Sequence, residues 1–482
     1  MEKNLKQQTV NGMFWQFMQK IGNQSIGFIV SVILARILLP DDYGVVALAG
    51  MFTALFAIFS DGGLGPALVQ KKDADSLDFD TLFTTQLVFS CITYVIIFFS
   101  APYFALLFDK PLLCDIIRVS ALGMPLGALG GVQNSILTRR MKFKWFFYVS
   151  FIGLAVSAVV GLTLAYSGYG AWALVFQGLS SSVVTTIVIF CFIDWHPHFR
   201  FSYKRFKLLF SQGIRYMGTA LIGKATGQVQ GYALGLKYSP ADLAYYSRGD
   251  GLPMLICNNI DSTIQGVLFP ALSQIQDNPE AVKKALRRAI RISTYILFPM
   301  LFGLSAISDK LIIIIFTEKW AASIPFMQLS CFCLAIGIMG NVNIQALKAR
   351  GRIDVILKME FIKKPLMVLI IIGTMFISPL AIMWGMFFFN IFVYFVNSYP
   401  NKRNINYSYK EQLKDVAYNF TLALLMAILV YLVGRININL YFDVIVQVLF
   451  GITFYSLVSW YTKNESMLYI INYIKERKIN HE

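Results

Sequence analysis

The sequence predicts an all-α polytopic membrane protein with about 14 transmembrane helices. Three observations support this class: an apolar composition, a series of long apolar stretches, and a regular alternation of basic and non-basic connections. Of the 482 residues, 57% are hydrophobic and only 14% are charged, whereas soluble domains carry roughly 25% charged residues. Disorder is excluded because the chain has too much apolar surface to bury. Six cysteines in this length predict no disulfide framework.

A helix needs about 20 predominantly apolar residues to cross the hydrocarbon core of a bilayer. Stretches that meet this requirement predict six spans in the first part of the chain, six in the second, and two more near the end. The expected spans are residues 12–38, 43–67, 81–107, 114–137, 145–167, 170–193, 208–236, 241–273, 290–315, 322–347, 361–378, 380–399, 415–434 and 441–461.

The positions of Lys and Arg test this map, because cytoplasmic connections of membrane proteins are enriched in basic residues. With the N-terminus placed inside, the inner segments hold 31 of the 42 basic residues, the outer connections hold 6, and 5 remain within the spans. The pattern therefore predicts that both termini are cytoplasmic. It also explains most of the net charge of +16 as a topology signal and an attraction to anionic lipids, so we expect no nucleic-acid partner.

An internal repeat divides the spans into two sets of six. The segment Leu64–Gln70 recurs as Leu268–Gln274, displaced by 204 residues, and Pro40-Asp-Asp42 recurs as Pro240-Ala-Asp242. A third match relates 130–140 to 340–350. Because six spans return the chain to the same side, the two sets form a parallel repeat, an arrangement that is typical of transporters. We expect a first lobe over 1–200, a second over 201–400, and two helices with a cytoplasmic tail over 401–482.

Charged and polar side chains within the spans predict the binding site, because a charge at the bilayer centre costs about 3 kcal/mol. They form stripes at helical spacing on the first, seventh and eighth spans, and such stripes are expected to face a shared aqueous cavity. The basic excess favours an anion such as phosphate or pyrophosphate. The predicted anion-binding residues are Lys20, Lys224, Arg248, Arg118 and Arg215, and the predicted polar lining is Gln16, Asn23, Gln228 and Asn258.

Three acids within the spans, Asp61, Asp250 and Asp261, are candidates for ion coupling or gating, and Pro66 and Pro270 are candidate hinges. Structural interpretations compete with these roles. Arg118 and Arg215 lie near span ends and can extend to the interface. Arg248 has Asp250 and Asp261 as candidate partners, and Asp61 precedes glycines that can end a helix. Proline is also common in transmembrane helices for reasons unrelated to hinges.

The sequence contains no pattern that predicts catalysis. The three histidines lie in a predicted cytoplasmic loop, as His196 and His198, and in the tail, as His481, and none accompanies a candidate nucleophile. Cys331 and Cys333 lack the usual zinc-ligand spacing, and no glycine-rich phosphate loop is present. We therefore expect no metal, no cofactor and no enzymatic activity.

Several motifs resemble the polysaccharide-transporter flippases, the Wzx-like branch of the multidrug/oligosaccharidyl-lipid/polysaccharide superfamily. They occur after the first span, in the second span, and at the turn between the fifth and sixth spans. Together with the expected spans, the resemblance covers nearly the whole chain and is closest to the colanic-acid-exporter-like subgroup. The motifs are Leu34-Ala-Arg36-Ile-Leu-Leu-Pro40-Asp-Asp-Tyr43-Gly44, Ser60-Asp61-Gly62-Gly63-Leu64 with Pro66-Ala67-Leu68-Val69, and Gly168-Tyr169-Gly170-Ala171-Trp172-Ala173-Leu174-Val175.

The resemblance implies two six-helix lobes in a V shape, as in MATE and MurJ transporters, within the bacterial inner membrane. It implies a flippase for undecaprenyl-pyrophosphate-linked oligosaccharide repeat units of O-antigen, capsule or exopolysaccharide. In related flippases cationic cavity residues contact the pyrophosphate, which corresponds here to Lys20, Lys224 and Arg248. Na⁺ or H⁺ would be the coupling ion, and a polysaccharide polymerase and a chain-length regulator would be further partners.

Three alternatives remain open at the level of sequence. An ion-coupled multidrug or small-molecule exporter of the same superfamily would be expected to carry buried acids rather than a net basic cavity. A membrane glycosyltransferase or ligase would need acid–base pairs and long external loops, which the sequence lacks. A scaffold for a polysaccharide-assembly complex would not need charged stripes within its spans.

Overall fold

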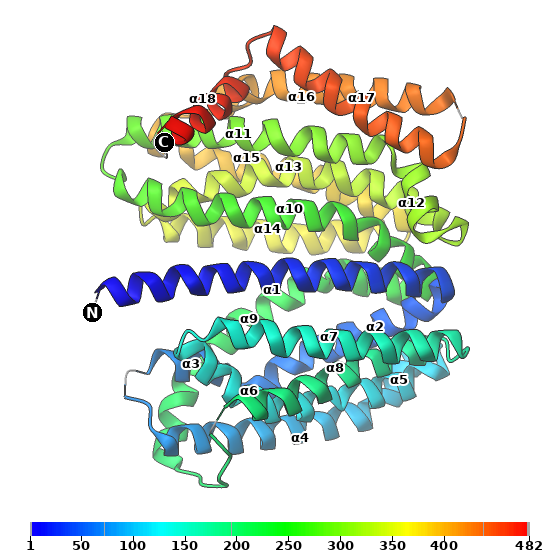
Figure 1. Cartoon of the computed structure of the whole chain (residues 1–482), viewed down its shortest axis with the longest axis vertical. Coiled ribbons are helices and arrows are strands. Elements are labelled where there is room, and N and C mark those ends of the chain that lie inside the picture. Colours follow the sequence, from blue (N-terminus) through cyan, green and yellow to red (C-terminus); the bar gives the residue numbers. More distant parts are fainter. Residues whose placement is uncertain (1, 72, 194, 437, 480–482) are drawn as a thin grey trace. The chain divides into compact units, whose positions relative to one another are not determined.

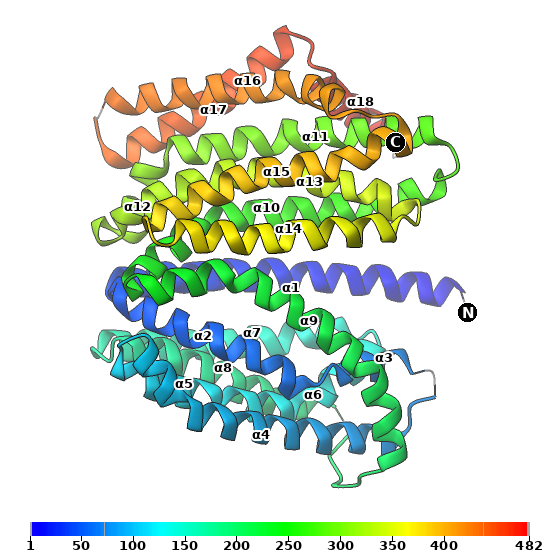
Figure 2. The ribbon, with the colours of Figure 1, turned by 180° about the vertical axis from the view of Figure 1, so that it is seen from behind.

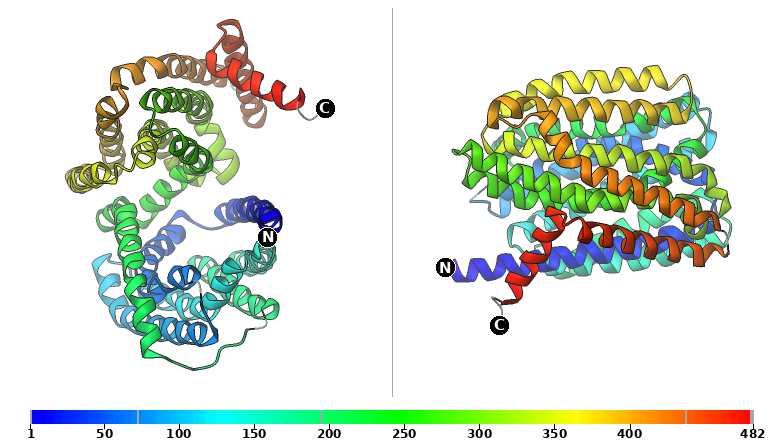
Figure 3. Two further views of the ribbon diagram at one scale, coloured as in Figure 1. Left: turned by 90° about the vertical axis from the view of Figure 1, so that its left-hand side faces the viewer. Right: turned by 90° about the horizontal axis from the view of Figure 1, so that it is seen from above.

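The computed structural model describes residues 2–71, 73–193, 195–436 and 438–479, and its regular structure is helical (Figure 1). The chain separates into two compact units, residues 1–244 and 245–482. Within each unit most of the helices run roughly parallel to one another, as the end-on view in Figure 3 (left) shows. The protein is an all-helical, multispan membrane protein, as the sequence predicts.

The helices of the first unit begin at the N-terminus and continue to the start of α10. They are α1 (Glu2–Ile37), α2 (Pro40–Asp61), α3 (Leu64–Gln70), α4 (Ser76–Leu107), α5 (Pro111–Ala121), α6 (Gly123–Arg139), α7 (Phe143–Tyr166), α8 (Ala171–Phe192) and α9 (Tyr203–Lys237).

The second unit contains most of α10 and all later helices. They are α10 (Pro240–Gln274), α11 (Pro279–Ala306), α12 (Ser308–Phe316), the 3₁₀ turn η1 (Glu318–Ser323), α13 (Ile324–Ala349), α14 (Ile353–Thr374), α15 (Pro379–Ile405), α16 (Tyr409–Val433), η2 (Gly434–Ile436), α17 (Leu440–Tyr461) and α18 (Glu465–Ile479). The last of these, α18, lies in the predicted tail and departs from the direction of the bundle (Figure 3, right).

Each expected span coincides with one helix or with two consecutive helices. The second, fourth and ninth spans are each divided, into α2 and α3, α5 and α6, and α11 and α12. Within the described residues, ten helical stretches are long and apolar enough to cross a membrane. The four expected spans outside this group are α1, α9, α10 and α14, and the first three carry the polar stripes.

The repeated Pro-x-Asp motif starts a helix in both copies. Asp42 accepts a hydrogen bond from the Leu39 amide at 3.0 Å, and Asp242 accepts one from the Ser239 amide at 3.1 Å. These bonds satisfy amides that a helix N-terminus leaves free. The two helix starts also meet, since a Cβ atom on Gly44 would lie only 1.9 Å from the Pro240 carbonyl oxygen. This part of the repeat therefore has a structural role.

Helix α9 crosses α2 and packs against α2, α3 and α4 (Figure 2). It therefore belongs to the first compact unit, although the repeat assigns it to the second lobe. The core of this unit includes an apolar cluster around α3, α4, α6 and α8 and another around α1, α7 and α8. The lobe boundaries at residues 200 and 400 stay a prediction.

The two appended helices, α16 and α17, are held to the second unit by buried polar contacts. Lys310 of α12 donates to Asp443 of α17 at 2.5 Å and to the Gly434 carbonyl at 2.6 Å. Asp415 of α16 accepts from Arg287 of α11 at 2.5 Å and from Tyr407 at 2.8 Å. Both partners are buried in the Lys310–Asp443 pair, and the Asp415 carboxylate is buried in the other. Leaving such a buried charge without its partner is costly, so α16 and α17 form a fixed part of this unit.

Candidate substrate-binding site

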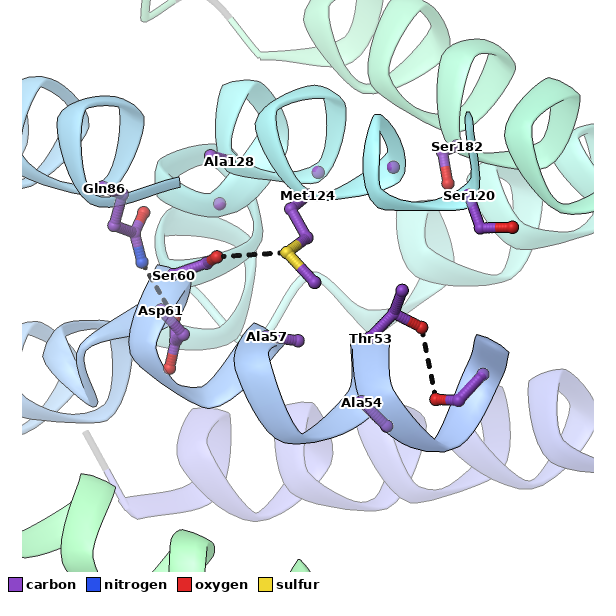
Figure 4. Close-up of a pocket in the computed structure, with 14 residues that line it drawn as sticks. Thr53, Ala54, Ala57, Ser60, Asp61, Gln86, Ser120, Met124, Ala128 and Ser182 are labelled. Carbon is purple, nitrogen blue, oxygen red and sulfur yellow. Dashed lines mark hydrogen bonds between the residues drawn. The ribbon is translucent and has the colours of Figure 1, made fainter. Parts of the chain in front are cut away.

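A cavity of about 450 Å³ lies in the first unit, between α2, α4, α5, α6 and α8 (Figure 4). Small residues leave this space open, and its polar groups are hydroxyls, an amide and one carboxylate. The lining residues are Gly50, Thr53, Ala54, Ala57, Ser60, Asp61, Gln86, Ser120, Gly123, Met124, Gly127, Ala128, Gly131 and Ser182. The cavity is therefore polar on a small-residue background, and none of its described lining residues is cationic.

Asp61 is the last residue of α2 and points toward Gln86 of α4 in Figure 4. The Gln86 amide donates to the Asp61 carboxylate at 2.9 Å. A Cβ atom on Gly131 would lie 2.5 Å from the Gln86 side-chain oxygen, so glycine at that position of α6 lets Gln86 adopt this orientation. Gly62 and Gly63 follow Asp61 in left-handed conformations, with φ values of 61° and 65°, which glycine adopts without strain.

A second cavity of about 720 Å³ lies on the α9 side of α2. It shares Asp61 with the first cavity and adds Lys224, which is exposed. Lys224 makes no hydrogen bond or ion pair within the described ranges. One carboxylate and one ammonium group therefore border the same cavity without forming a salt bridge, and both remain able to contact a ligand.

The five predicted cations divide into two groups. Lys20 of α1 and Arg215 and Lys224 of α9 are exposed, and the described part of the chain offers them no bonded partner. The other two are engaged by the protein. The Arg118 guanidinium lies 4.2 Å from the Phe98 ring centroid, and its Nε donates to the Phe98 carbonyl at 3.2 Å.

Arg248 of α10 is half-buried, and its guanidinium lies 5.4 Å from the Phe316 ring centroid and 5.5 Å from the Trp320 ring centroid. Such cation–π contacts hold the side chain in place. The structural interpretations that compete with binding are extension to the interface for Arg118 and pairing with an acid for Arg248. Both guanidinium groups contact aromatic rings, and the roles predicted for the two residues stay predictions.

The polar stripe of α1 lies beside the face that packs on α7. That packing face includes Gln19, which donates to Ser150 at 2.9 Å, and Gly22, whose added Cβ would contact Phe147 at 3.6 Å. Of the predicted lining residues, Gln16 is exposed and Asn23 is half-buried on α1. On the other two stripes, Gln228 of α9 is half-buried and Asn258 of α10 is exposed.

The stripe of α10 faces α13 along a ladder of side-chain hydrogen bonds. Ser330 donates to Asp250, Asn341 donates to Asp261 at 3.1 Å, and Gln345 donates to Gln265 at 3.0 Å. Each bond joins residues 80 positions apart, so the two helices run in the same direction with constant register. One carboxylate oxygen of Asp261 has no hydrogen-bond partner among the described residues, and a coupling role for these acids stays a prediction.

The candidate hinges occupy different settings. Pro66 lies within α3, after the break that Gly62 and Gly63 produce, and Pro270 lies within the uninterrupted α10.

Sequence reasoning missed Gln86, whose only signal is a single amide within the apolar run 81–107. It also counted Lys310 among the outer basic residues without anticipating its buried pair with Asp443.

The sequence is similar to a protein family and to several individual proteins of bacteria. The model of a protein family described as polysaccharide biosynthesis protein matches residues 33–325. The chain is 28% identical to the succinoglycan biosynthesis transport protein ExoT of Rhizobium meliloti (strain 1021), over 70% of this chain and 68% of that protein. It is 23% identical to the lipopolysaccharide biosynthesis protein WzxC of Escherichia coli (strain K12), over 89% and 88% of the two chains.

Among solved structures, the fold is similar to the inward closed conformation of the lipid II flippase MurJ, with a TM-score of 0.76 and 15% identity over 94% of this chain and 99% of that one. An inward-facing multidrug resistance MATE family transporter matches with a TM-score of 0.61 and 15% identity, over 79% and 94% of the two chains. At these identities the structural matches establish the fold alone, which resembles that of MurJ and of the MATE transporter.

Proposed function

Because the chain belongs to the polysaccharide biosynthesis protein family and its relative ExoT is a transport protein, we propose that the chain is a transporter rather than an enzyme, and specifically a lipid-linked oligosaccharide flippase. The proposed cargo is an undecaprenyl-pyrophosphate-linked repeat unit of O-antigen, capsule or exopolysaccharide, moved across the bacterial inner membrane by alternating access. The names of ExoT and WzxC support a polysaccharide cargo, and that of MurJ supports a lipid-linked one. WzxC and the N-terminal motifs favour the colanic-acid-exporter-like subgroup.

The observation that carries this proposal is the set of unpaired cations on the two polar helices α1 and α9. Lys20, Arg215 and Lys224 are exposed and lack bonded partners within the described ranges. A buried or membrane-embedded charge is costly unless an opposite charge compensates it. A pyrophosphate supplies that compensation and offers several oxygens to separate cations. We assign Arg118 and Arg248, which aromatic rings already hold, a secondary part in attracting the anion.

Asp61 is the proposed coupling or gating acid in the first unit. It borders the cavity of hydroxyl groups on one side of α2 and shares the other cavity with Lys224. Binding of Na⁺ or H⁺ at Asp61 changes the charge beside Lys224, and therefore changes the attraction of Lys224 for an anion. Asp250 and Asp261 are proposed to act in the second unit through the ladder with α13. Polymerase and chain-length regulator are proposed as partners that receive the translocated unit.

The carboxylate-lined cavity also favours one alternative, an ion-coupled exporter of small cations in the same superfamily. A cation would bind Asp61 in the cavity that lacks basic residues. This alternative gives Lys20 and Lys224 no direct role, so variants of these lysines separate the two functions.

The test is a flipping assay with the purified protein in liposomes that contain a fluorescent polyprenyl-pyrophosphate-linked glycan. Removing one charge-assisted contact costs about 1–3 kcal/mol, so we expect Lys20→Ala and Lys224→Ala each to slow flipping about tenfold or more. Lys207→Ala is the matched control, since Lys207 is exposed on α9 outside both cavities. Normal flipping by both lysine variants, or no flipping by the wild type, would refute the proposal.

Cells that lack the protein provide an independent readout. We expect lipid-linked repeat units to accumulate on the inner leaflet, where an impermeant label does not reach them. Normal surface labelling of these units in a clean deletion would contradict a flippase function and favour the exporter.

A further inference from the structure

A groove of about 740 Å³ lies in the second unit, between the end of α13, the start of α14 and the end of α15. It contains none of the residues proposed above for cargo binding, and it does not depend on that function. Its lining combines basic and apolar residues: Leu347, Arg352, Val355, Lys358, Met359, Ile362, Phe395, Val396, Tyr399, Pro400, Arg403 and Asn404. Three of these lining residues are basic, namely Arg352, Lys358 and Arg403.

Arg352, Lys358 and Arg403 give the groove a positive end. Lys358 and Arg403 are exposed and have no bonded partner among the residues that the structure describes. Arg352 lies 3.3 Å from Asp354, in a pair whose two side chains are more than half exposed. Such exposed pairs are weak and exchange easily with other ions.

The other acid on this stretch of α14 is already neutralised. Glu360 pairs with Lys363 at 2.5 Å and lies within 3.9 Å of Lys364. The charge that faces the groove is therefore net positive, with Asp354 as its single acidic neighbour in the described part of α14.

The remainder of the groove is apolar and open. Ile362 is 58% exposed, Phe395 is 40% exposed and Tyr399 is 63% exposed. These side chains lie along α14 and α15, one or more helical turns from the basic end. Exposed apolar residues in a membrane protein are suited to contact lipid chains, and tyrosine is enriched at the membrane–water interface.

We propose that this groove binds one anionic phospholipid. The phosphate and the acidic headgroup contact Arg352, Lys358 and Arg403, and an acyl chain lies along Met359, Ile362 and Phe395. A free phosphate would leave the apolar wall uncovered, and a zwitterionic headgroup would place its own cation beside three others. The basic residues belong to connections that the distribution of Lys and Arg assigns to the cytoplasmic side, where anionic lipids attract basic segments.

The experiment compares lipid retention by the purified full-length protein, measured by native mass spectrometry after addition of phosphatidylglycerol. Basic residues attract anionic lipid headgroups, so the triple variant R352Q/K358Q/R403Q should bind this lipid at least about tenfold more weakly. The matched control K348Q/K402Q/K410Q removes three exposed basic residues from the same connections but outside the groove. Equal losses in both variants would show diffuse attraction and overturn the proposal.

A second pair of variants tests the apolar wall without changing charge. Ile362→Trp fills the groove and should reduce retention, whereas Phe361→Trp, at a neighbouring 80% exposed position outside the lining, should not. Both positions are exposed, so thermal unfolding should match that of the wild type. Full retention by Ile362→Trp would overturn the proposed path of the acyl chain.

Competing ligands distinguish the source of the anion. Phosphatidylcholine should bind at least about tenfold more weakly than phosphatidylglycerol, and inorganic phosphate should not displace the bound lipid. Preference for undecaprenyl phosphate over phosphatidylglycerol would identify a cargo site and reject the phospholipid. Because the readout is lipid retention, its result is independent of the flipping assay.

Discussion

The segment that contains α2 and α3 and the segment that forms α10 are related by the repeat but follow different backbone paths. In the first, Gly62 and Gly63 interrupt the helix in left-handed conformations. At the positions displaced by 204 residues, Gly266 and Val267 continue α10 without interruption. The contrast shows that a sequence motif repeated in both halves does not ensure the same helix geometry in both.

The same two regions also differ in how their polar groups are satisfied. In the first unit, Gly131 of α6 lines the cavity beside Asp61, and among the described residues Ser135 of α6 bonds only within its own helix. At the positions displaced by 210 residues, Asn341 and Gln345 of α13 extend amide groups to α10 and form the ladder. Small residues therefore keep the first unit open where amide side chains fill the second.

The largest expected effect follows from Gly63→Val. A Cβ atom at Gly63 would lie 2.2 Å from the Gly213 carbonyl oxygen of α9, and its φ of 65° disfavours a β-branched residue. Backbone strain and steric overlap each cost about 1–3 kcal/mol, so the free energy of unfolding should fall by about 3 kcal/mol or more. Thermal unfolding in detergent measures the loss.

The reciprocal variant, Val267→Gly, is the control. Val267 lies in continuous helix and is 69% exposed, so the expected loss is only about 0.5 kcal/mol from the difference in helix propensity between valine and glycine. Equal sensitivity at the two positions would show that the break at Gly62 and Gly63 is not the distinguishing feature of the first half.

The sequence predicts the helices well because apolar length and the positions of basic residues are properties of each segment alone. The sequence predicts the break between α2 and α3 less well, because the two related segments, Asp61-Gly62-Gly63 and Gln265-Gly266-Val267, are similar. The position of Gly213 on α9, which requires glycine at residue 63, is a tertiary contact. Spacing along one helix cannot identify that contact.

The same limit applies to the polar stripes. Helical periodicity places Asp250, Asp261 and Gln265 on one face of a helix, but it does not reveal what lies opposite that face. The structure places Ser330, Asn341 and Gln345 there. For α9 the opposite neighbour is a cavity that Lys224 borders, so one sequence signal corresponds to two environments.

A smaller loss of stability is expected when the ladder is broken. Gln345→Ala removes the donor to Gln265 from a side chain that is 3% exposed. Hydrogen bonds between membrane helices contribute about 0.6 kcal/mol on average and up to about 2 kcal/mol, so we expect a loss of about 1 kcal/mol. Ser135→Ala is the related change in the first unit.

Ser135 donates to the Gly131 carbonyl of its own helix at 3.1 Å and joins no other helix through that bond. Its removal should therefore cost less than that of Gln345, by about 0.5 kcal/mol or more. If Ser135→Ala proves as damaging as Gln345→Ala, the ladder does not distinguish the two units.

The smallest expected change in stability comes from Gly131→Asn, which gives the first half the residue found at the equivalent position of the second. The new Cβ would lie 2.5 Å from the Gln86 side-chain oxygen, but Gln86 can rotate, and that oxygen lacks a partner among the described residues. The new amide can donate to it, and asparagine is a better helix former than glycine. These gains offset the crowding, so the free energy of unfolding, measured by thermal unfolding, should change by less than about 1 kcal/mol.

Transport should nevertheless fall several-fold, because the new side chain narrows the cavity and moves Gln86 away from Asp61. Gly178→Asn makes the same chemical change at an exposed position of α8 outside the cavity, where an added Cβ meets nothing within 4 Å, and it should leave transport unchanged. A Gly131→Asn variant that is stable and transports at the wild-type rate would mean that the open space beside Asp61 is not used. The difference between the two units would then lie in packing alone, and Lys20, Arg215 and Lys224 would carry the function without Asp61.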